Sequence, residues 1–159
     1  MINLTNFKKE AIIKYKSRKK FILKLKKQKN KKIDTLFNDA DNSVFKKIDC
    51  LTCAYCCKNV GPLFTNKDIQ RISKIMKLSP GNFVNRYLKI DEDEDYVLKN
   101  IPCDFLLEDN YCSIYEFRPK ACREYPHTQM KNQKKMLNLN LKNCEYCPAV
   151  NEIFNKISC

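Results

Sequence analysis

Apolar side chains recur at roughly helical spacing near the start of the chain. Between residues 5 and 32, one face of a 3.6-residue helix carries Phe7, Ala11, Tyr15, Ile22 and Leu25. Arg18 interrupts this stripe, and lysines occupy much of the remaining surface. The pattern predicts a basic helix that packs one face on the domain, forms a partly disordered tail, or binds an anionic membrane or nucleic acid. We favour the first two, because no aromatic-rich RNA-binding signature accompanies the lysines.

Shorter, mixed elements follow this helix. Residues 30–47 are polar and are predicted to form a linker. Thr65 and Asp68 form a capping box that opens a helix with Ile69 and Ile72 on its apolar face. The other expected elements are a helix at 82–89, a strand at 96–98, a hairpin at 105–115, a short helix after Pro119, a strand at 137–141 and a terminal helix at 148–157. Together they predict a small α+β fold.

Charge divides the chain into two parts. Residues 1–49 contain 15 Lys or Arg against 5 Asp or Glu, whereas residues 50–159 contain 16 against 13. We therefore predict a basic helical extension and linker over residues 1–49, followed by a separate domain over residues 50–159. No run of 18 apolar residues indicates a transmembrane helix, and the N-terminus lacks the apolar stretch of a signal peptide, so we expect a reducing, cytoplasmic location.

Four cysteines lie within eight residues, in the segment Cys50-Leu-Thr-Cys53-Ala-Tyr-Cys56-Cys57. A C-x2-C turn brings two sulfurs onto one metal and points backbone N–H groups at the thiolates. A packed core does not require this density of thiols. The other six cysteines are Cys103, Cys112, Cys122, Cys144, Cys147 and Cys159. In a chain expected in a reducing compartment, clustered cysteines favour metal over disulfides, so metal is expected to nucleate the domain.

The spacing leaves the metal open. Cys50, Cys53 and Cys56 match the first three positions of the bacterial ferredoxin run, but the C-x3-C-P ending is missing. Zinc accepts four-cysteine sites readily, so zinc and an iron–sulfur cluster are both compatible. If residues 50–57 were helical, Cys56 would lie roughly 100° around the axis from Cys57. The two neighbours therefore need not serve the same metal.

The chain resembles the CxxCxxCC domain proteins, or YkgJ-type cysteine-cluster proteins, which are described as a zinc- or iron-chelating domain. The resemblance covers about residues 50–150 and rests on the knuckle at 50–57, on Thr65-x2-Asp68-Ile69, and on Cys103-Asp-Phe-Leu106. Its longest motif is Cys112-Ser-Ile-Tyr-Glu-x-Arg118-Pro-x2-Cys122-Arg123-x-Tyr-Pro. The resemblance implies eight metal ligands, namely Cys50, Cys53, Cys56, Cys57, Cys103, Cys112, Cys122 and Cys144.

Other residues are assigned supporting roles. Cys147 is a further candidate ligand, and Arg118 and Arg123 could donate hydrogen bonds to sulfur or offset the charge of the site. Ordinary ion pairs with Glu116 or Glu124 are an equal alternative for the two arginines. We expect a metal or an unidentified protein as partner, with nucleic acid or a membrane surface not favoured.

Two classes of function are the main alternatives, beside a carrier that releases zinc or iron to other proteins and a zinc module that binds nucleic acid through the basic extension. The first is a non-catalytic zinc or iron–sulfur module, favoured because the ligands are all cysteine and no convincing acid–base set is present. The second is an iron–sulfur enzyme or electron-transfer component, since the family includes proteins similar to flagellin lysine N-methylases. This chain shows no recognisable methyl-donor site, and no catalytic residue can be assigned.

Overall fold

The computed structural model describes residues 6–158 and contains two compact units. The helical unit comprises the residues up to Asp49 together with those from Pro126, and the cysteine unit comprises Cys50–Tyr125. Helices and a three-stranded sheet make this an α+β protein. None of the helices between residues 6 and 158 has the length and apolar character needed to cross a bilayer. The division into domains at residue 49 stays a sequence prediction.

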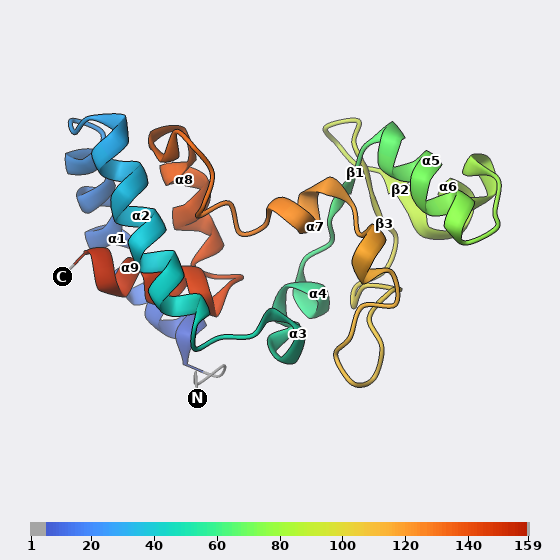
Figure 1. The fold of residues 1–159 in the computed structure, drawn as a ribbon, viewed down its shortest axis with the longest axis horizontal. Helices are drawn as coiled ribbons and strands as arrows, with labels where there is room; N and C mark the ends of the chain where they lie inside the picture. Colours follow the sequence, from blue (N-terminus) through green and yellow to red (C-terminus); the bar gives the residue numbers. More distant parts are fainter. Residues whose placement is uncertain (1–5, 159) are drawn as a thin grey trace. The chain divides into compact units, whose positions relative to one another are not determined.

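Four helices build the helical unit (Figure 1). They are α1 (Phe7–Leu25), α2 (Asn30–Phe45), α8 (Gln133–Asn143) and α9 (Pro148–Ile157). Helix α2 packs on α8 and α9, and α1 packs on the same two helices. In the core, the rings of Phe37 and Phe154 meet edge to face with centroids 5.8 Å apart. Both rings are fully buried, so they join α2 to α9.

Helix α1 buries four of the five residues of the predicted stripe and also the arginine that interrupts it, whereas Tyr15 is 37% exposed. Phe7, Ala11, Ile22 and Leu25 are buried, and Arg18 is only 1% exposed. The guanidinium of Arg18 donates to the side-chain oxygen of Asn151 at 2.7 Å and to that of Asn155 at 2.8 Å. Because Asn151 and Asn155 lie on α9, Arg18 belongs to the face of α1 that packs against α9. The helix ends at Leu25, seven residues earlier than predicted.

Two predictions for this unit were wrong. The expected linker at 30–47 is largely helix α2, because Ile33, Phe37, Ala40 and Val44 recur three or four residues apart and are buried. The expected strand at 137–141 lies within helix α8. Leu137 and Leu141 are four residues apart and buried, whereas Leu139 is 40% exposed. The alternation of leucine with asparagine is compatible with the two-residue period of a strand and with the period of a helix, and the structure has a helix here.

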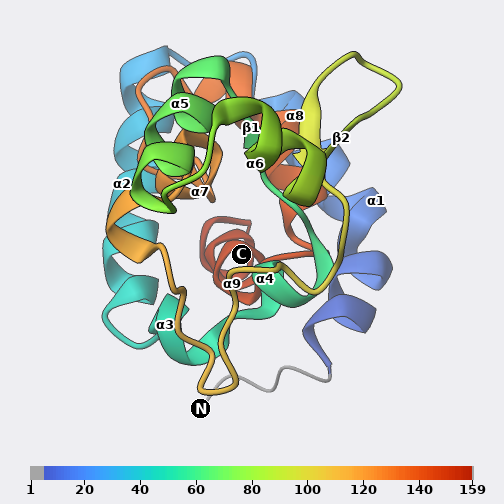
Figure 2. The same cartoon turned by 90° about the vertical axis from the view of Figure 1, so that its right-hand side faces the viewer.

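The cysteine unit contains short elements around a small sheet (Figure 2). Its elements are α3 (Cys50–Cys53), α4 (Tyr55–Asn59), β1 (Leu63–Phe64), α5 (Asn66–Ile75), α6 (Pro80–Tyr87), β2 (Leu88–Ile90), β3 (Tyr96–Leu98), the 3-10 turn η1 (Tyr115–Phe117) and α7 (Lys120–Glu124). Strand β3 lies between β1 and β2, antiparallel to both, with Val97 opposite Leu63 and Lys89. Helices α5 and α6 pack side by side in this unit.

A cluster of apolar residues holds the sheet and the helices together. Its members are Phe64, Ile69, Ile72, Phe83, Leu88, Leu98, Phe105 and Ile114. The rings of Phe83 and Phe105 stack in parallel, with centroids 6.3 Å apart. Cys103 and Cys112 pack against this cluster from its border. The core of the cysteine unit therefore positions two of the predicted ligands directly.

Several local predictions were confirmed. The Thr65–Asp68 capping box is present at the start of α5, strand β3 is where it was expected, and a short helix carries Cys122. The terminal helix begins at Pro148 as predicted. The predicted hairpin at 105–115 is reduced to one bridge between Leu106 and Cys112, with a turn at Asp109 and Asn110.

Candidate metal centre

The cysteine knuckle, residues 50–57, is two short helices rather than one. Ala54 separates α3 from α4 and has a left-handed backbone conformation, with φ at 45°. Its side chain is 3% exposed, so a small residue fits this buried bend. Because of this break, the four thiols do not lie on one continuous helix. The Sγ atoms of Cys56 and Cys57 lie 4.0 Å apart.

A backbone contact links the knuckle to the second cysteine segment. The N–H of Cys103 donates to the carbonyl oxygen of Cys57 at 2.8 Å. The chain then turns, with the N–H of Ser113 donating to the carbonyl of Phe105 at 2.8 Å. Cys103 and Cys112 are thus held at the two ends of one turn. This brings thiols that are far apart in sequence into one region.

Four thiols interact electrostatically in every pairing, and we call Cys57, Cys103, Cys112 and Cys122 the inner thiols. Burial, followed by the neighbouring thiols, raises the pKa of Cys103 to about 11 and that of Cys122 to about 12. Burial also raises the pKa of Cys112, with Cys57 adding to the effect. Four separate segments contribute these groups, so their proximity is a product of the fold.

Cys57 differs from the other inner thiols. A hydrogen bond from the Cys56 thiol, opposed by burial and assisted by a backbone N–H and by Lys58, lowers the pKa of Cys57 to about 7. Cys57 therefore holds a thiolate more readily than its three neighbours. A thiolate is the form of cysteine that binds metal, so one of the inner thiols, Cys57, readily supplies a metal ligand.

Arg118 lies beside the inner thiols. Its positive charge acts against the rise in pKa at both Cys112 and Cys122. Its guanidinium carbon is 3.7 Å from the centre of the Tyr115 ring. Arg123 is exposed and donates to the backbone carbonyl of Arg118 at 3.1 Å. Arg118 is therefore placed to offset thiolate charge, whereas Arg123 contacts the backbone of the segment that carries Arg118.

The remaining predicted ligands are distributed unevenly. In the knuckle, Cys50 is exposed, and Cys53 and Cys56 are half-buried. Cys144 and Cys147 belong to the helical unit, where Cys144 is 1% exposed and interacts with the carbonyl of Asn140 at 3.4 Å. Cys159 lies outside the described residues. The structure thus groups the inner thiols within one unit and places Cys144 in the core of the other.

The chemistry of the inner thiols suits zinc or iron, because four cysteine sulfurs are a common ligand set for both. The four inner thiols form no disulfide in the structure. Across residues 6–158, however, no three histidine, cysteine, aspartate or glutamate side chains converge into a ready ligand group. Metal binding would therefore have to draw the sulfurs closer together.

Sequence reasoning missed a buried contact beside Cys122. The prediction gave Asp68 only the role of capping α5. In the structure Asp68 also accepts a hydrogen bond from the backbone N–H of Lys120 at 3.1 Å, while Arg71 donates to the carbonyl of Phe117 at 2.6 Å. Arg71 lies three residues after Asp68, so an ion pair between them could have been anticipated. Its contacts with a segment more than 40 residues away could not.

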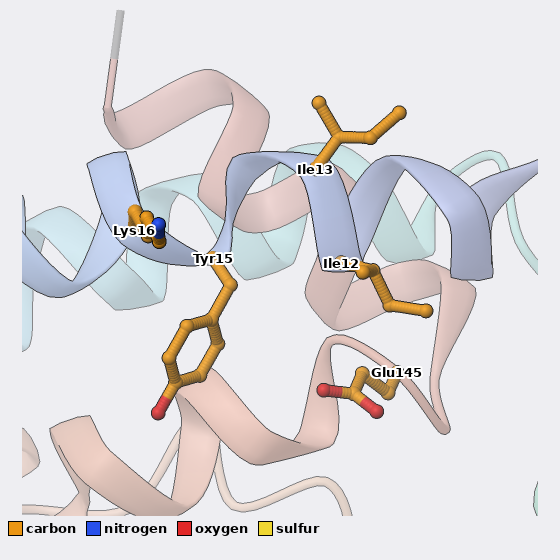
Figure 3. Close-up of a pocket in the computed structure, with 5 residues that line it drawn as sticks. All are labelled: Ile12, Ile13, Tyr15, Lys16 and Glu145. Carbon is orange, nitrogen blue, oxygen red and sulfur yellow. The ribbon is translucent and has the colours of Figure 1, made fainter.

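A hollow of about 450 Å³ lies in the helical unit (Figure 3). It is lined by Ile12, Ile13, Tyr15, Lys16 and Glu145. The tyrosine ring and the carboxylate of Glu145 flank it, and Ile12 and Ile13 are largely exposed. None of the predicted metal ligands lines this hollow.

The fold and the grouped thiols define a cysteine-rich metal-binding domain. A family model described as "CxxCxxCC: Putative zinc- or iron-chelating domain" matches residues 49–148. Since this match covers more than half of the chain, the protein belongs to the CxxCxxCC family, as its motifs predicted. No solved structure matches the fold at a significant level.

Proposed function

We propose that this protein binds zinc or iron through the inner thiols and serves as a non-catalytic metal-binding module. The observation that carries the proposal is the hydrogen bond from the N–H of Cys103 to the carbonyl of Cys57 at 2.8 Å, which joins two of the segments that carry the inner thiols. The charges of Cys57, Cys103, Cys112 and Cys122 also affect the pKa values within this group. These residues come from α4, from both ends of the 103–112 turn, and from α7. One metal bound by four such segments would cross-link most of the cysteine unit.

Metal binding would contribute to folding as well as to function. The sheet of the cysteine unit has strands of only two or three residues, and its apolar cluster is small. Small domains of this kind commonly gain stability from a structural metal. A bound metal would supply coordination bonds between segments, and three of the inner thiols would release protons to form them. We therefore propose that metal nucleates this unit.

The knuckle provides further thiols for a second, outer group. Cys50, Cys53 and Cys56 lie in the same unit as the inner thiols and are partly accessible. Together with Cys144 they would complete the eight ligands that the family resemblance implies. Cys144 is buried among apolar residues of the helical unit. Its role as a ligand is therefore a separate proposal, which can be tested independently of the inner group.

Metal and sulfide analysis tests this function. Protein purified without oxygen should contain zinc, or iron with or without acid-labile sulfide, and Cys122→Ser should lower that metal content. Glu108→Gln, which changes an exposed side chain in the turn between Cys103 and Cys112, should leave it unchanged. Iron with matching sulfide would identify a cluster, and zinc without sulfide a zinc site. A wild-type chain free of both metals, or full occupancy in Cys122→Ser, would refute the inner-thiol site.

No observation within the described residues favours the enzyme alternative. A catalytic site would require a pocket next to an incompletely coordinated metal. The hollow beside Ile12 and Tyr15 contains no cysteine in its lining. We therefore retain the non-catalytic module as the proposal.

A further inference from the structure

Asp68 is the most heavily hydrogen-bonded buried acid of the cysteine unit. Its side chain is 3% exposed. Oδ2 accepts from the N–H of Thr65 at 3.1 Å and from the Thr65 hydroxyl at 2.6 Å. Oδ1 accepts from Arg71 at 2.7 Å and from the N–H of Lys120 at 3.1 Å. These contacts offset the cost of burial and leave the pKa of Asp68 below its ordinary value.

The two oxygens of Asp68 serve different parts of the fold. Oδ2 completes the capping box of α5, which is a local contact within residues 65–68. Oδ1 reaches the first residue of α7, which has no side-chain cap of its own at Pro119. The carboxylate thus satisfies a backbone N–H at the start of the helix that carries Cys122. Capping α5 alone would require only one of these oxygens.

Arg71 adds two further contacts to the same segment. Its Nη1 donates to the carbonyl of Phe117 at 2.6 Å, and its Nη2 donates to the carbonyl of Arg118 at 3.2 Å. Pro119, which follows, is buried and has no N–H of its own. Three backbone groups between Phe117 and Lys120, namely two carbonyls and one N–H, are therefore hydrogen-bonded to side chains of α5. All three contacts come from a single ion pair on α5.

We propose that the Asp68–Arg71 pair positions Cys122 for metal binding. The inference rests on the proposed function of the inner thiols. Cys122 lies two residues after Lys120 within the five-residue helix α7, so fixing the start of this helix fixes the path of the cysteine. The same segment carries Arg118, whose charge acts on Cys112 and Cys122. Asp68 and Arg71 are positioning residues, because neither side chain is itself a proposed ligand.

The charge and shape of the pair are both required for this role. An asparagine at position 68 keeps the size of the side chain but replaces one acceptor oxygen with an N–H2 donor. Either Thr65 or Lys120 would then lose its acceptor, and Arg71 would lose its anionic partner. A lysine at position 71 would lack the planar fork that reaches two carbonyls and a carboxylate together.

A zinc titration of metal-stripped protein, with a competing chelator, tests the proposal. Asp68→Asn should weaken zinc binding by about 10- to 100-fold, as is usual when groups that orient metal ligands are removed. Thr65→Val is the matched control, since it damages the cap of α5 but leaves the Lys120 contact in place. It should lower stability and keep the zinc affinity of the wild type.

A double-mutant cycle separates positioning from general loss of stability. In a Cys122→Ser background, Asp68→Asn should have no further effect on zinc affinity, because the thiol that it positions is absent. An equal loss in both backgrounds, or no loss in either, would overturn the proposal. Arg71→Gln provides a second variant if Asp68→Asn does not fold, and it should show the same dependence on Cys122. A wild-type chain that takes up neither zinc nor iron would instead refute the proposed function.

Discussion

The backbone N–H of Cys103 donates to the carbonyl oxygen of Cys57 at 2.8 Å, which joins two cysteine segments through main-chain atoms. This contact requires no metal and no particular state of either thiol. It places the two residues next to each other whether or not the site is filled. The inner group can therefore be partly preorganised in the metal-free protein, which lowers the ordering that metal binding must bring about.

Thiol labelling should distinguish the inner group from the buried cysteine of the helical unit. We expect iodoacetamide to modify Cys57 readily in metal-free protein and Cys103 more slowly, because burial raises the pKa of Cys103. Bound metal should protect both, because a coordinated sulfur is not a free nucleophile. Cys144 should react slowly in both states, since it is 1% exposed. Mass spectrometry of the labelled peptides measures each site. Equal labelling of Cys103 with and without metal would contradict the ligand set.

Replacing Cys144 tests whether it is a ligand or a core residue. Its burial and its contact with the carbonyl of Asn140 favour packing, so Cys144→Ala should retain the metal content of the wild type. Removing the buried sulfur should lower the free energy of unfolding by about 1 kcal/mol. Metal analysis and denaturant titration measure the two effects. Loss of metal in this variant would establish Cys144 as a ligand.

The asparagine contacts of Arg18 should be important for stability. Asn151→Ala removes an acceptor from the buried guanidinium and a donor that lies 2.6 Å from Glu10. We expect the free energy of unfolding to fall by about 1–3 kcal/mol, the usual cost of removing one hydrogen-bond partner from a buried charged group; Arg18 keeps its contact with Asn155. Urea denaturation followed by circular dichroism measures this. Asn138→Ala, at an exposed position on α8, should change stability little. Equal effects of the two variants would show that the contact is not stabilising.

The same region should be sensitive to acid. Lys14 contributes most to lowering the pKa of Glu10, from 4.5 to about 2, against the effect of burial and with help from Asn151 and Asn155. A carboxyl with a lowered folded-state pKa stabilises the fold fully above its ordinary value and loses that contribution as pH falls. Stability should therefore decline between about pH 4.5 and pH 2 through this group. Glu10→Gln should be less stable at neutral pH and show less of this decline.

A matched control makes the acid experiment specific. Glu145→Gln removes a half-buried carboxylate from the same unit but not from the contact with Lys14. This variant should keep the acid-dependent loss of stability seen in the wild type. Thermal denaturation at a series of pH values provides the comparison. Identical profiles for Glu10→Gln and the wild type would rule out Glu10 as the source.

Local signals in the sequence predicted much of the cysteine unit. The capping box at Thr65, the strand at 96–98 and the short helix around Cys122 each depend on residues close in the chain, and each was confirmed. Helix α2 was missed because most of its residues are polar. Its few buried apolar residues are recognisable as one face only when they are read at helical spacing. Helix α8 was missed because its leucines also alternate. In both cases packing between helices decided the structure.

The candidate site was predictable in composition but not in arrangement. The spacing of the cysteines predicts metal ligands, and the family match supports a zinc- or iron-chelating domain. The grouping of Cys57 with Cys103, Cys112 and Cys122 depends on a turn, a short helix and a main-chain hydrogen bond. The bend at Ala54 was also unforeseen, since alanine seldom adopts a left-handed conformation. Long-range contacts of this kind leave no periodic signal in the sequence.

The helical unit is assembled from both ends of the chain, whereas the cysteine unit is one continuous segment. During synthesis, Tyr125 emerges from the ribosome before α8 and α9 do. Domains tend to fold as units in the order in which they emerge. The nascent cysteine unit could therefore acquire its metal while α1 and α2 still lack α8 and α9. On the ribosome, metal supply would then affect the earliest stage of maturation, before the final helices emerge.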